Sequence, residues 1–285
     1  MQSKTNTIFV TGSSGFIGKS LINSIIKIKK YKVICLSNLQ KIKPSSKYTV
    51  VKKNELFQTV KKIDYVIHAA ACDEFNVKEK KEISKKNKSL DSFITKVVKK
   101  YKIKKLIFLS SNRVYESCNE SLILENSKTS PTSVYGQSKL QSEKTFKKLK
   151  TNLIILRLPS VISKNFSKGL IFRLVSDLKK KKKINVYNPN SRFNNIITIS
   201  DLINMIMISL NKIIIKKTKI INISSCNPEK FTNVISFLAQ KLKRDPELNI
   251  YKVKKKSFYY SNTVQKNFFK RNFLTVKSAL NSIFT

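Results

Sequence analysis

One stretch near the amino terminus decides the fold: Thr7-Ile-Phe-Val-Thr-Gly-Ser-Ser-Gly-Phe-Ile-Gly18. Its apolar start predicts a buried strand, and the residues that follow Gly18 predict a helix. Three of the chain's five glycines, Gly12, Gly15 and Gly18, lie in the turn between the two. Glycine permits positive φ and close approach of a ligand, and a helix start directs free N–H groups at an anion. The stretch therefore predicts a strand–turn–helix unit that binds the pyrophosphate of a dinucleotide.

The chain repeats this alternation of short apolar strands and longer helices. The predicted strands are residues 7–10, 32–37, 49–51, 65–69, 105–110, 153–158 and 219–223, and the predicted helices are residues 18–29, 80–101, 133–150, 166–181, 200–210 and 230–243. The strands are unbroken runs rich in Ile, Val and Leu, which is typical of a parallel sheet covered on both faces. The pattern predicts an α/β protein of Rossmann type with a doubly wound parallel sheet.

The carboxyl-terminal part differs from the rest of the chain. Residues 230–285 hold more helix and loop than strand, so they predict a smaller lobe beside the sheet. We expect an NAD(P)-binding Rossmann domain over residues 1–160. A carboxyl-terminal substrate-binding lobe over residues 161–285 would be partly interleaved with the sheet.

The charge balance is strongly basic, with 58 Lys and Arg against 16 Asp and Glu and a formal net charge of +42. Such a balance can indicate a nucleic acid or an anionic membrane as the partner. Only six of the basic residues are Arg, whose planar fork suits phosphates, and the chain contains no nucleic-acid-binding motif. We therefore expect no specific nucleic-acid partner. A positive surface would still attract a phosphorylated cofactor and an anionic substrate.

The four cysteines lie far apart, without a CxxC pair or a nearby histidine cluster. They predict reduced thiols and no metal site. Residues 1–6 lead directly into the first strand, and no apolar run approaches the roughly 20 residues needed to cross a membrane. We therefore expect a cytoplasmic protein without a membrane partner.

The end of the second predicted strand bears on the choice of cofactor. An acidic residue at this place would bind the adenosine ribose and select NAD. The sequence has Ser37 and Asn38 there, followed by Lys41 and Lys43. A small polar residue with lysines nearby can accept a 2′-phosphate, so both NAD and NADP stay open as the cofactor.

Tyr135-Gly-Gln-Ser-Lys139 lies at the start of a predicted helix. The spacing of four residues places both side chains on one helix face. We expect the ammonium of Lys139 and a cationic nicotinamide ring to favour the Tyr135 phenolate, although a free tyrosine has a pKa of about 10. Such a tyrosine can move a proton to or from a sugar hydroxyl while the cofactor moves a hydride.

Two hydroxyl residues, Ser110 and Ser111, stand at the end of the preceding strand. Ligands of open α/β sheets bind at the carboxyl ends of the strands, so a serine there can hold the reacting oxygen beside the tyrosine. This position gives meaning to a Tyr–Lys spacing that is otherwise common in a chain so rich in lysine.

These motifs, in this order, resemble the NAD-dependent epimerase/dehydratase family, the extended short-chain dehydrogenases. Residues 11–18 resemble the family's cofactor loop, residues 64–71 its fourth strand, and residues 87–90 the helix segment whose asparagine lies near the nicotinamide. Residues 110–115 resemble its active-site strand end, and aligning Val114-Tyr115 with the family's Val-Tyr selects Ser111 as the catalytic hydroxyl. Residues 157–161 resemble the segment with a proline near the nicotinamide, and residues 192–202 the stretch between substrate lobe and sheet.

The resemblance implies a set of site residues. The catalytic residues would be Ser111, Tyr135 and Lys139. The cofactor would contact Gly12, Ser14, Gly15, Phe16, Ile17, Gly18, Ser37, Ala69, Ala70, Asn87, Tyr135, Lys139 and Pro159. By position, the substrate pocket would draw on Ser111, Arg113, Asn165 and Arg192, and the fork of Arg192 suits the paired oxygens of a diphosphate. The lone histidine, His68, is interpreted as a packed, hydrogen-bonded structural residue.

Two departures from the family's pattern narrow the chemistry. The family's sugar-nucleotide dehydratases carry an acidic pair directly after the catalytic hydroxyl, and this chain has Asn112 and Arg113 there. Dehydration is therefore disfavoured. The third-strand region also lacks the aspartate usually seen near the adenine, so Asn54 or a backbone group would replace it.

The resulting expectation is an NAD(P)-dependent epimerase that removes a hydride from a nucleotide-sugar, at C4 of the hexose, and returns it to the other face. An NADPH-dependent keto-sugar reductase is the alternative among enzymes. A non-catalytic NAD(P)- or RNA-binding member of the fold is the alternative outside them. The architecture favours a homodimer, whereas the strong like charge favours a monomer.

Overall fold

The computed structural model describes residues 5–37, 45–74, 79–165, 167–214, 217–251, 253 and 258–285. Asn38, Lys41 and Lys43, on which the case for NADP depends, lie outside these residues. The chain forms two compact units: the first comprises Met1–Glu116, Thr129–Arg157 and Ile203–Ile221, and the second comprises Ser117–Lys128, Leu158–Leu202 and Asn222–Thr285. The domain boundary at residue 160 stays a prediction.

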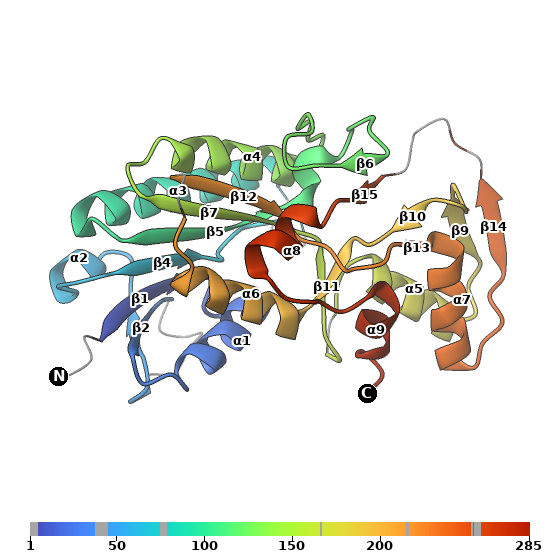
Figure 1. Cartoon of the computed structure of the whole chain (residues 1–285), viewed down its shortest axis with the longest axis horizontal. Helices are drawn as coiled ribbons and strands as arrows, with labels where there is room; N and C mark the ends of the chain where they lie inside the picture. The colour runs from blue at the N-terminus through green and yellow to red at the C-terminus, as the bar shows by residue number, and fades with distance from the viewer. Residues whose placement is uncertain are drawn as a thin grey trace. The chain divides into compact units, whose positions relative to one another are not determined.

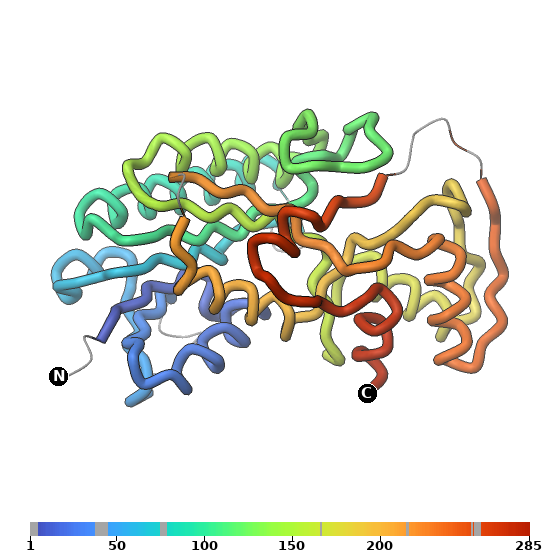
Figure 2. The backbone as a smooth tube through the Cα atoms, viewed as in Figure 1, coloured from blue at the N-terminus to red at the C-terminus, as the bar shows by residue number. Residues whose placement is uncertain are grey.

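The first unit is built on a seven-stranded sheet with the order β12-β7-β5-β4-β1-β2-β3. Its strands are β1 (Asn6–Thr11), β2 (Tyr31–Leu36), β3 (Thr49–Val51), β4 (Tyr65–His68), β5 (Lys105–Ser111), β7 (Asn152–Leu158) and β12 (Thr218–Asn222). The pairs β1–β2, β2–β3, β1–β4 and β4–β5 are parallel. Figure 2 shows β12, from late in the chain, returning beside β7. The predicted doubly wound α/β fold is confirmed.

Helices cover both faces of this sheet. They are α1 (Phe16–Ile25), α2 (Leu56–Thr59), α3 (Lys80–Tyr101), α4 (Val134–Lys147) and α6 (Ile199–Asn211). In Figure 1, α3 and α4 lie on one face, and α1 and α6 lie on the other. Phe9 and Phe108 of the sheet, Phe93 of α3 and Phe146 of α4 share one buried cluster. Because both faces are buried, the strands can be apolar along their whole length.

The order of the sheet reverses between β1 and β4, and this reversal positions the site. From β1 the chain goes on to β2 and β3 on one side of β1, and it then returns to form β4 on the other side of β1. Thr11 at the end of β1 is paired in register with His68 at the end of β4, and His68 with Phe108 of β5. Three carboxyl-terminal strand ends therefore meet at one edge, where open α/β sheets bind their ligands.

Buried and capping polar groups fix two helices at their ends. The hydroxyl of Ser133, at the N-cap of α4, accepts a hydrogen bond of 3.0 Å from the Gly136 amide. At the carboxyl-terminal end of α6, the buried ammonium of Lys105 donates to the carbonyls of Ser209, Leu210 and Lys212 at 2.6, 3.0 and 2.6 Å. A cation at a helix carboxyl terminus satisfies free carbonyls and complements the helix dipole.

The second unit contains short elements. Its strands pair as β10 (Arg192–Phe193) with β13 (Glu229–Lys230), β11 (Ile196–Thr198) with β8 (Ser160–Ile162), β14 (Leu248–Tyr251) with β9 (Ile184–Tyr187), and β15 (Tyr259–Tyr260) with β6 (Leu122–Ile123). Its helices include α5 (Leu170–Lys179), α7 (Phe231–Leu242), α8 (Thr263–Phe269) and α9 (Val276–Asn281). Side chains of α5, α7 and α9 form its buried core.

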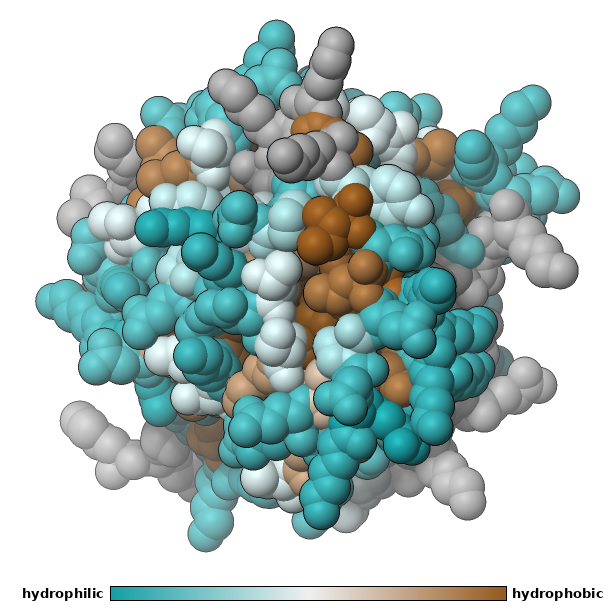
Figure 3. Space-filling model, turned by 90° about the vertical axis from the view of Figure 1, so that its right-hand side faces the viewer, coloured by the Kyte–Doolittle hydropathy of each residue, from teal (hydrophilic) through white to brown (hydrophobic). Residues whose placement is uncertain are grey.

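The surface of this second unit is largely polar. Figure 3 shows a short strip of apolar groups surrounded by hydrophilic ones on the face that includes β14. Ile250 of β14 is 58% exposed, and Val253, which follows β14 in the chain, is 41% exposed. Within the described residues, every helix is too short or too polar to cross a membrane. The cytoplasmic location and the homodimer stay predictions.

In the glycine turn between β1 and α1, the glycines pack closely against the backbone of Gly12. Gly12 has a φ of 73°, and its carbonyl oxygen accepts a hydrogen bond of 2.9 Å from the Gly15 amide. A Cβ at Gly18 would lie 2.1 Å from the Gly12 carbonyl oxygen, which is a backbone atom, whereas a Cβ at Gly15 would lie 3.2 Å from it. The turn therefore depends on Gly18 for its shape, while Gly15 leaves the outside of the turn open.

These distances predict unequal effects of two alanine substitutions. Gly18→Ala should lower the free energy of unfolding by about 1–3 kcal/mol, because the methyl group forces backbone atoms apart. Gly15→Ala needs a shift of only a few tenths of an ångström and should cost less than half as much. Urea unfolding of the two variants without added cofactor measures the difference. Equal losses would contradict the packing of Gly18 against Gly12.

Candidate active site

The first part of the site is the glycine turn. Helix α1 begins at Phe16 with Gly15 as its N-cap, and its first turn contains no acidic residue. Gly15 and Phe16 are exposed, and Ser14 and Ile17 are half-buried. The backbone amides at this helix start, together with the positive end of the helix dipole, suit a pyrophosphate. A glycine at position 15 leaves room for the phosphates against the main chain.

The turn lies directly beside the end of β4. A Cβ on Gly12 would meet the Ala70 nitrogen at 2.7 Å, so Gly12 allows this close approach. The Thr11 hydroxyl accepts a hydrogen bond of 3.2 Å from the Ala70 amide, and the Ser13 hydroxyl donates to the Leu36 carbonyl at 2.8 Å. Ser37 follows that carbonyl at the end of β2. The structure thus brings the predicted cofactor residues of β1, β2 and β4 to one edge.

The three predicted catalytic residues come from two neighbouring elements. Ser111 ends β5, and Tyr135 and Lys139 occupy the first turns of α4, one turn apart on the same face. The buried Lys139 ammonium lies 5.8 Å from the centre of the Tyr135 ring and donates to the Leu109 carbonyl of β5 at 2.7 Å. This bond holds the lysine against the strand that carries Ser111.

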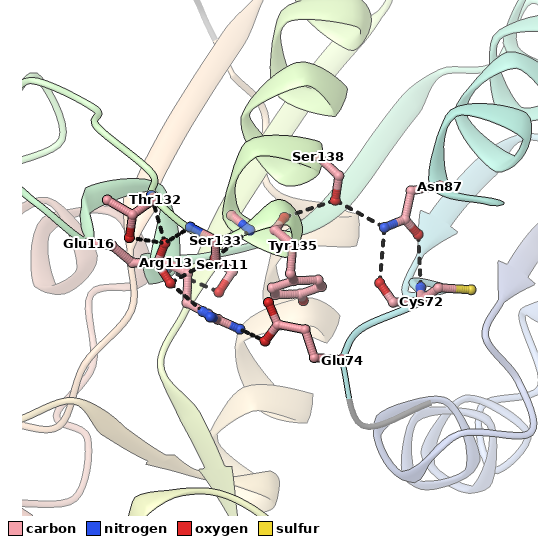
Figure 4. Close-up of polar contacts among 11 residues, drawn as sticks. Cys72, Glu74, Asn87, Ser111, Arg113, Glu116, Thr132, Ser133, Tyr135 and Ser138 are labelled. Atoms are coloured by element: carbon pink, nitrogen blue, oxygen red, sulfur yellow. Dashed lines mark hydrogen bonds and ion pairs between the residues drawn. The ribbon is translucent and has the colours of Figure 1, made fainter. Parts of the chain in front are cut away.

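Asn87, on α3, connects three parts of the site. Its carboxamide accepts from the Cys72 amide at 2.8 Å and donates to the Cys72 carbonyl at 2.9 Å. It also donates to the Ser138 hydroxyl at 3.0 Å, and Ser138 in turn donates to the Tyr135 carbonyl at 2.8 Å (Figure 4). Asn87 therefore ties the loop after β4 to the first turn of α4.

Arg113 lies beside the tyrosine. Its guanidinium carbon is 5.6 Å from the centre of the Tyr135 ring, and its amide donates to the Ser111 hydroxyl at 3.2 Å. The guanidinium forms ion pairs with Glu74 at 2.8 Å and with Glu116 at 2.5 Å, as Figure 4 shows. Ser111, Arg113 and Tyr135 are thus brought together, and the contact of Ser111 and Arg113 with a substrate stays a prediction.

Comparison with known proteins gives the same family. The model of the NAD dependent epimerase/dehydratase family matches residues 8–224. The chain belongs to this family. The uncharacterized UDP-glucose epimerase YtcB of Bacillus subtilis is 26% identical over 235 residues, which cover 72% of each chain. A putative UDP-glucose 4-epimerase of Methanocaldococcus jannaschii is 31% identical over 154 residues, covering 49% of this chain and 50% of that protein.

Solved structures agree in fold. The Bordetella bronchiseptica enzyme WbmG, in complex with NAD, superposes with a TM-score of 0.83 at 17% identity, covering 99% of this chain and 94% of that one. UDP-glucuronic acid 4-epimerase from Bacillus cereus, in complex with UDP-glucuronic acid and NAD, has a TM-score of 0.78 at 19% identity, with 98% of both chains covered. The predicted resemblance to an enzyme family with NAD as its cofactor is confirmed.

In this epimerase/dehydratase chain, a buried ion pair holds the catalytic helix in place. The Glu143 carboxylate of α4 accepts two hydrogen bonds from Arg157 of β7, at 2.9 and 2.7 Å, and one from the Ser110 hydroxyl at 2.6 Å. Arg157 also donates to the Tyr115 hydroxyl. Glu143 is 0% and Arg157 2% exposed. Sequence reasoning missed this pair, although Glu143 continues the four-residue spacing of Tyr135 and Lys139.

A second buried group lies behind Lys139. His68 is 1% exposed, hydrogen-bonds Thr11 at 2.7 Å and lies 3.4 Å from the Asp91 carboxylate of α3. Asp91 also accepts a bond of 2.6 Å from the Ser142 hydroxyl. Burial lowers the pKa of His68, so its imidazole is neutral at pH 7. The prediction that His68 is a hydrogen-bonded structural residue is confirmed, whereas Asp91 was missed.

The pKa of Tyr135 does not follow the sequence-based expectation. Burial of the phenol raises it, and the carboxylates of Asp73 and Glu74 raise it further, while Arg113 opposes them. Burial also lowers the pKa of Lys139 to about 8, with Asp91 and Glu143 acting in the other direction. The expected lowering of the Tyr135 pKa by Lys139 is therefore wrong for the protein itself. The sequence shows which residues are neighbours but not how far each is desolvated.

The remaining predicted residues belong to the second unit. Pro159 is buried between β7 and β8, and Asn165 is exposed in a turn. Arg192 lies 5.5 Å from the Tyr259 ring. It lines a cavity of about 230 Å³ together with Leu122, Asn227, Pro228, Tyr259, Tyr260, Ser261, Asn262 and Lys266. Arg192 thus has a polar and aromatic cavity beside it, and Asn165 is not among the lining residues.

The Glu143–Arg157 pair predicts a specific pattern of stability. Glu143→Leu should lower the free energy of unfolding by about 3–5 kcal/mol, because it leaves the Arg157 charge buried without a counter-ion. The double variant Glu143→Leu with Arg157→Met should lose less than this single variant, since both charges are gone. Urea unfolding measures both. A double variant that is less stable than Glu143→Leu would show that the pair is not the cause.

Lys139 predicts a pH dependence of stability. Its pKa is about 8 in the folded protein and 10.5 in the unfolded chain, so the unfolded chain binds more protons between these values. The free energy of unfolding therefore gains a contribution as pH rises through this window. Relative to Lys139→Met, the wild type should gain about 1–3 kcal/mol between about pH 7 and pH 10.5. Parallel stability curves for the two proteins would contradict the burial of a charged lysine.

Proposed function

We propose that this chain is an NAD-dependent epimerase that inverts C4 of the hexose in a nucleotide-sugar. The observation that carries the proposal is the placement of Tyr135 and Arg113 at the strand end that bears Ser111, on the sheet edge that also holds the glycine turn. The relatives named above as UDP-glucose and UDP-glucuronic acid epimerases support it.

Tyr135 and Ser111 would have different roles toward the sugar hydroxyl and its proton. A bound NAD would supply the acceptor and the donor of the hydride at the sugar carbon. The Tyr135 hydroxyl takes the proton of the sugar hydroxyl during oxidation and gives it back during reduction. The Ser111 hydroxyl binds the same sugar oxygen and fixes its direction. Because burial raises the pKa of Tyr135, the positive charge of Arg113, which acts in the opposite direction, is needed to favour its deprotonated form.

The residues of the glycine turn fit the pyrophosphate of a bound NAD. The start of α1 offers backbone amides without an acidic residue in the first turn, and Gly15 has no side chain to block the phosphates. Ser37 follows the last residue of β2, where the adenosine ribose would lie, and Ala69, Ala70 and Asn87 would contact the nicotinamide half. Within the second unit, Arg192 and its cavity suit a diphosphate.

Dehydration is disfavoured for a chemical reason. Elimination of water from a sugar needs an acid and a base beside the catalytic hydroxyl, and Asn112 and Arg113 occupy those positions. A carboxamide does not titrate, and a guanidinium stays protonated at all working pH values. Neither side chain can transfer a proton, so the keto-sugar formed at Tyr135 is reduced again and not dehydrated.

Replacement of the tyrosine tests the proposal. Tyr135→Phe should lower kcat for interconversion of UDP-glucose and UDP-galactose, or of the corresponding uronic acids, by about 10²–10⁴-fold. The epimer ratio after incubation, measured by chromatography, gives the rate, and thermal unfolding checks that the variant is folded. Retention of the C4 deuterium of labelled substrate distinguishes hydride return from exchange with water. Full activity of Tyr135→Phe would refute the assignment.

A further inference from the structure

Arg113 has two carboxylate partners of different character. Its Nε atom contacts Glu116 at 2.5 Å, and its Nη1 atom contacts Glu74 at 2.8 Å. Glu116 is fixed, since it also accepts hydrogen bonds from the Thr132 and Ser133 amides and the Ser133 hydroxyl. Burial by itself would raise the pKa of Glu116, but the bonds from Ser133 and Arg113 outweigh it and lower the pKa to about 2. Glu116 is therefore always ionised and sets the direction of the guanidinium.

Glu74 holds the other edge of the guanidinium much less firmly. The side chains of Arg113 and Glu74 are both 38% exposed. Glu74 lies in the turn after β4 and not in a helix or strand. Exposed ion pairs contribute only about 0–1 kcal/mol. A second carboxylate can therefore replace Glu74 at low cost, and Glu74 itself demonstrates that the Nη1 edge accepts one.

This edge lies close to the tyrosine. The guanidinium carbon is 5.6 Å from the centre of the Tyr135 ring (Figure 4), and in the proposed reaction the Tyr135 hydroxyl acts on the oxygen at C4. C6 of a hexose is only two bonds from C4. A substituent on C5 is therefore within reach of the group that stands beside the tyrosine.

We propose that the Nη1 edge of Arg113 binds a carboxylate at C6 of the sugar, which makes nucleotide-linked uronic acids the substrate class. The inference rests on the proposed C4 chemistry. A carboxylate can replace Glu74 with a charge-assisted, forked contact. A neutral hydroxymethyl group cannot compete for this edge, so Arg113 stays paired with Glu74 when a neutral hexose binds. The net charge of +42 also favours approach of a substrate that carries a further negative charge.

Selectivity between two substrates tests the inference. We expect the wild type to have a higher kcat/KM for UDP-glucuronic acid than for UDP-glucose. Arg113→Gln should lower the ratio of the two kcat/KM values by about 10–100-fold, mainly through KM for the uronic acid. Arg113→Lys should lie between the two, because lysine keeps the charge and loses the fork. Glu74→Gln should raise the ratio, since it removes the competing carboxylate.

A matched control separates local from global charge. Arg173 is exposed on α5 in the second unit, and Arg173→Gln removes the same charge. This control should leave the selectivity ratio unchanged. Thermal unfolding of each variant checks its folding, and Arg113→Lys keeps the test valid if Arg113→Gln fails to fold. An equal effect of Arg113→Gln on both substrates, or a lower ratio in Glu74→Gln, would overturn the inference.

Calorimetric binding distinguishes this inference from the proposed function. UDP-glucuronic acid and UDP-glucose are titrated into wild type, Arg113→Lys and Glu74→Gln. Arg113-dependent preference for the uronic acid supports carboxylate binding even if neither sugar is epimerised, in which case only the C4 chemistry fails. Tyr135-dependent epimerisation of UDP-glucose with no preference for the uronic acid in binding or turnover leaves the proposed function intact and overturns the role of Arg113.

Discussion

The rest of the active site depends on one buried ion pair, that of Glu143 with Arg157. Its two ends come from the catalytic helix α4 and from β7, and Ser110 of β5 donates to the same carboxylate. Because Glu143 lies one turn after Lys139 and two turns after Tyr135, the pair fixes the rotation of α4 about its own axis. A buried pair contributes little net stability, since desolvation offsets attraction, but it specifies one arrangement. Here the specified arrangement is a tyrosine and a lysine facing the strand end that carries Ser111.

Four of the chain's 16 acidic residues, Glu74, Asp91, Glu116 and Glu143, lie near Tyr135 and its neighbouring cations. Asp91 and Glu143 lie within the fold behind Lys139, and their negative charge opposes the effect of burial on the lysine. Glu74 and Glu116 flank Arg113 on the open side of the tyrosine. The tyrosine thus lies near two cations, Lys139 and Arg113, and each of them has carboxylates nearby. Their balance therefore influences whether the phenol can accept a proton.

Much of the first unit could be predicted from sequence, whereas in the second unit the helices α5 and α7 could be predicted and the short strands could not. All seven predicted strands became the strands of the central sheet, because strands buried on both faces leave unbroken apolar runs. The helix Lys80–Tyr101 ends where predicted, but α1 begins at Phe16, since extended Gly15 caps it and Gly18 packs within it. Strands of two residues such as β10 and β13 carry no periodic signal. Their pairing follows from tertiary contacts alone, as does the backbone bond from Phe231 to Ser191 beside them.

In the site, too, some features could be predicted from the sequence and others could not, residue by residue. Tyr135 and Lys139 are neighbours in sequence, whereas the partners that control their charge, such as Asp91 and Glu74, come from other elements and leave no local pattern. Arg113 is the instructive case, because its position after Ser111 was visible but its two partners were not. The catalytic serine, tyrosine and lysine are compatible with several reactions of one fold. In the proposed reaction, the side chains at 112 and 113 select among these reactions. Neither Asn112 nor Arg113 can transfer a proton, which disfavours elimination, and the cation of Arg113 beside the tyrosine favours a substrate with a further negative charge. The proposed reaction type and the proposed substrate charge therefore depend on the same two positions.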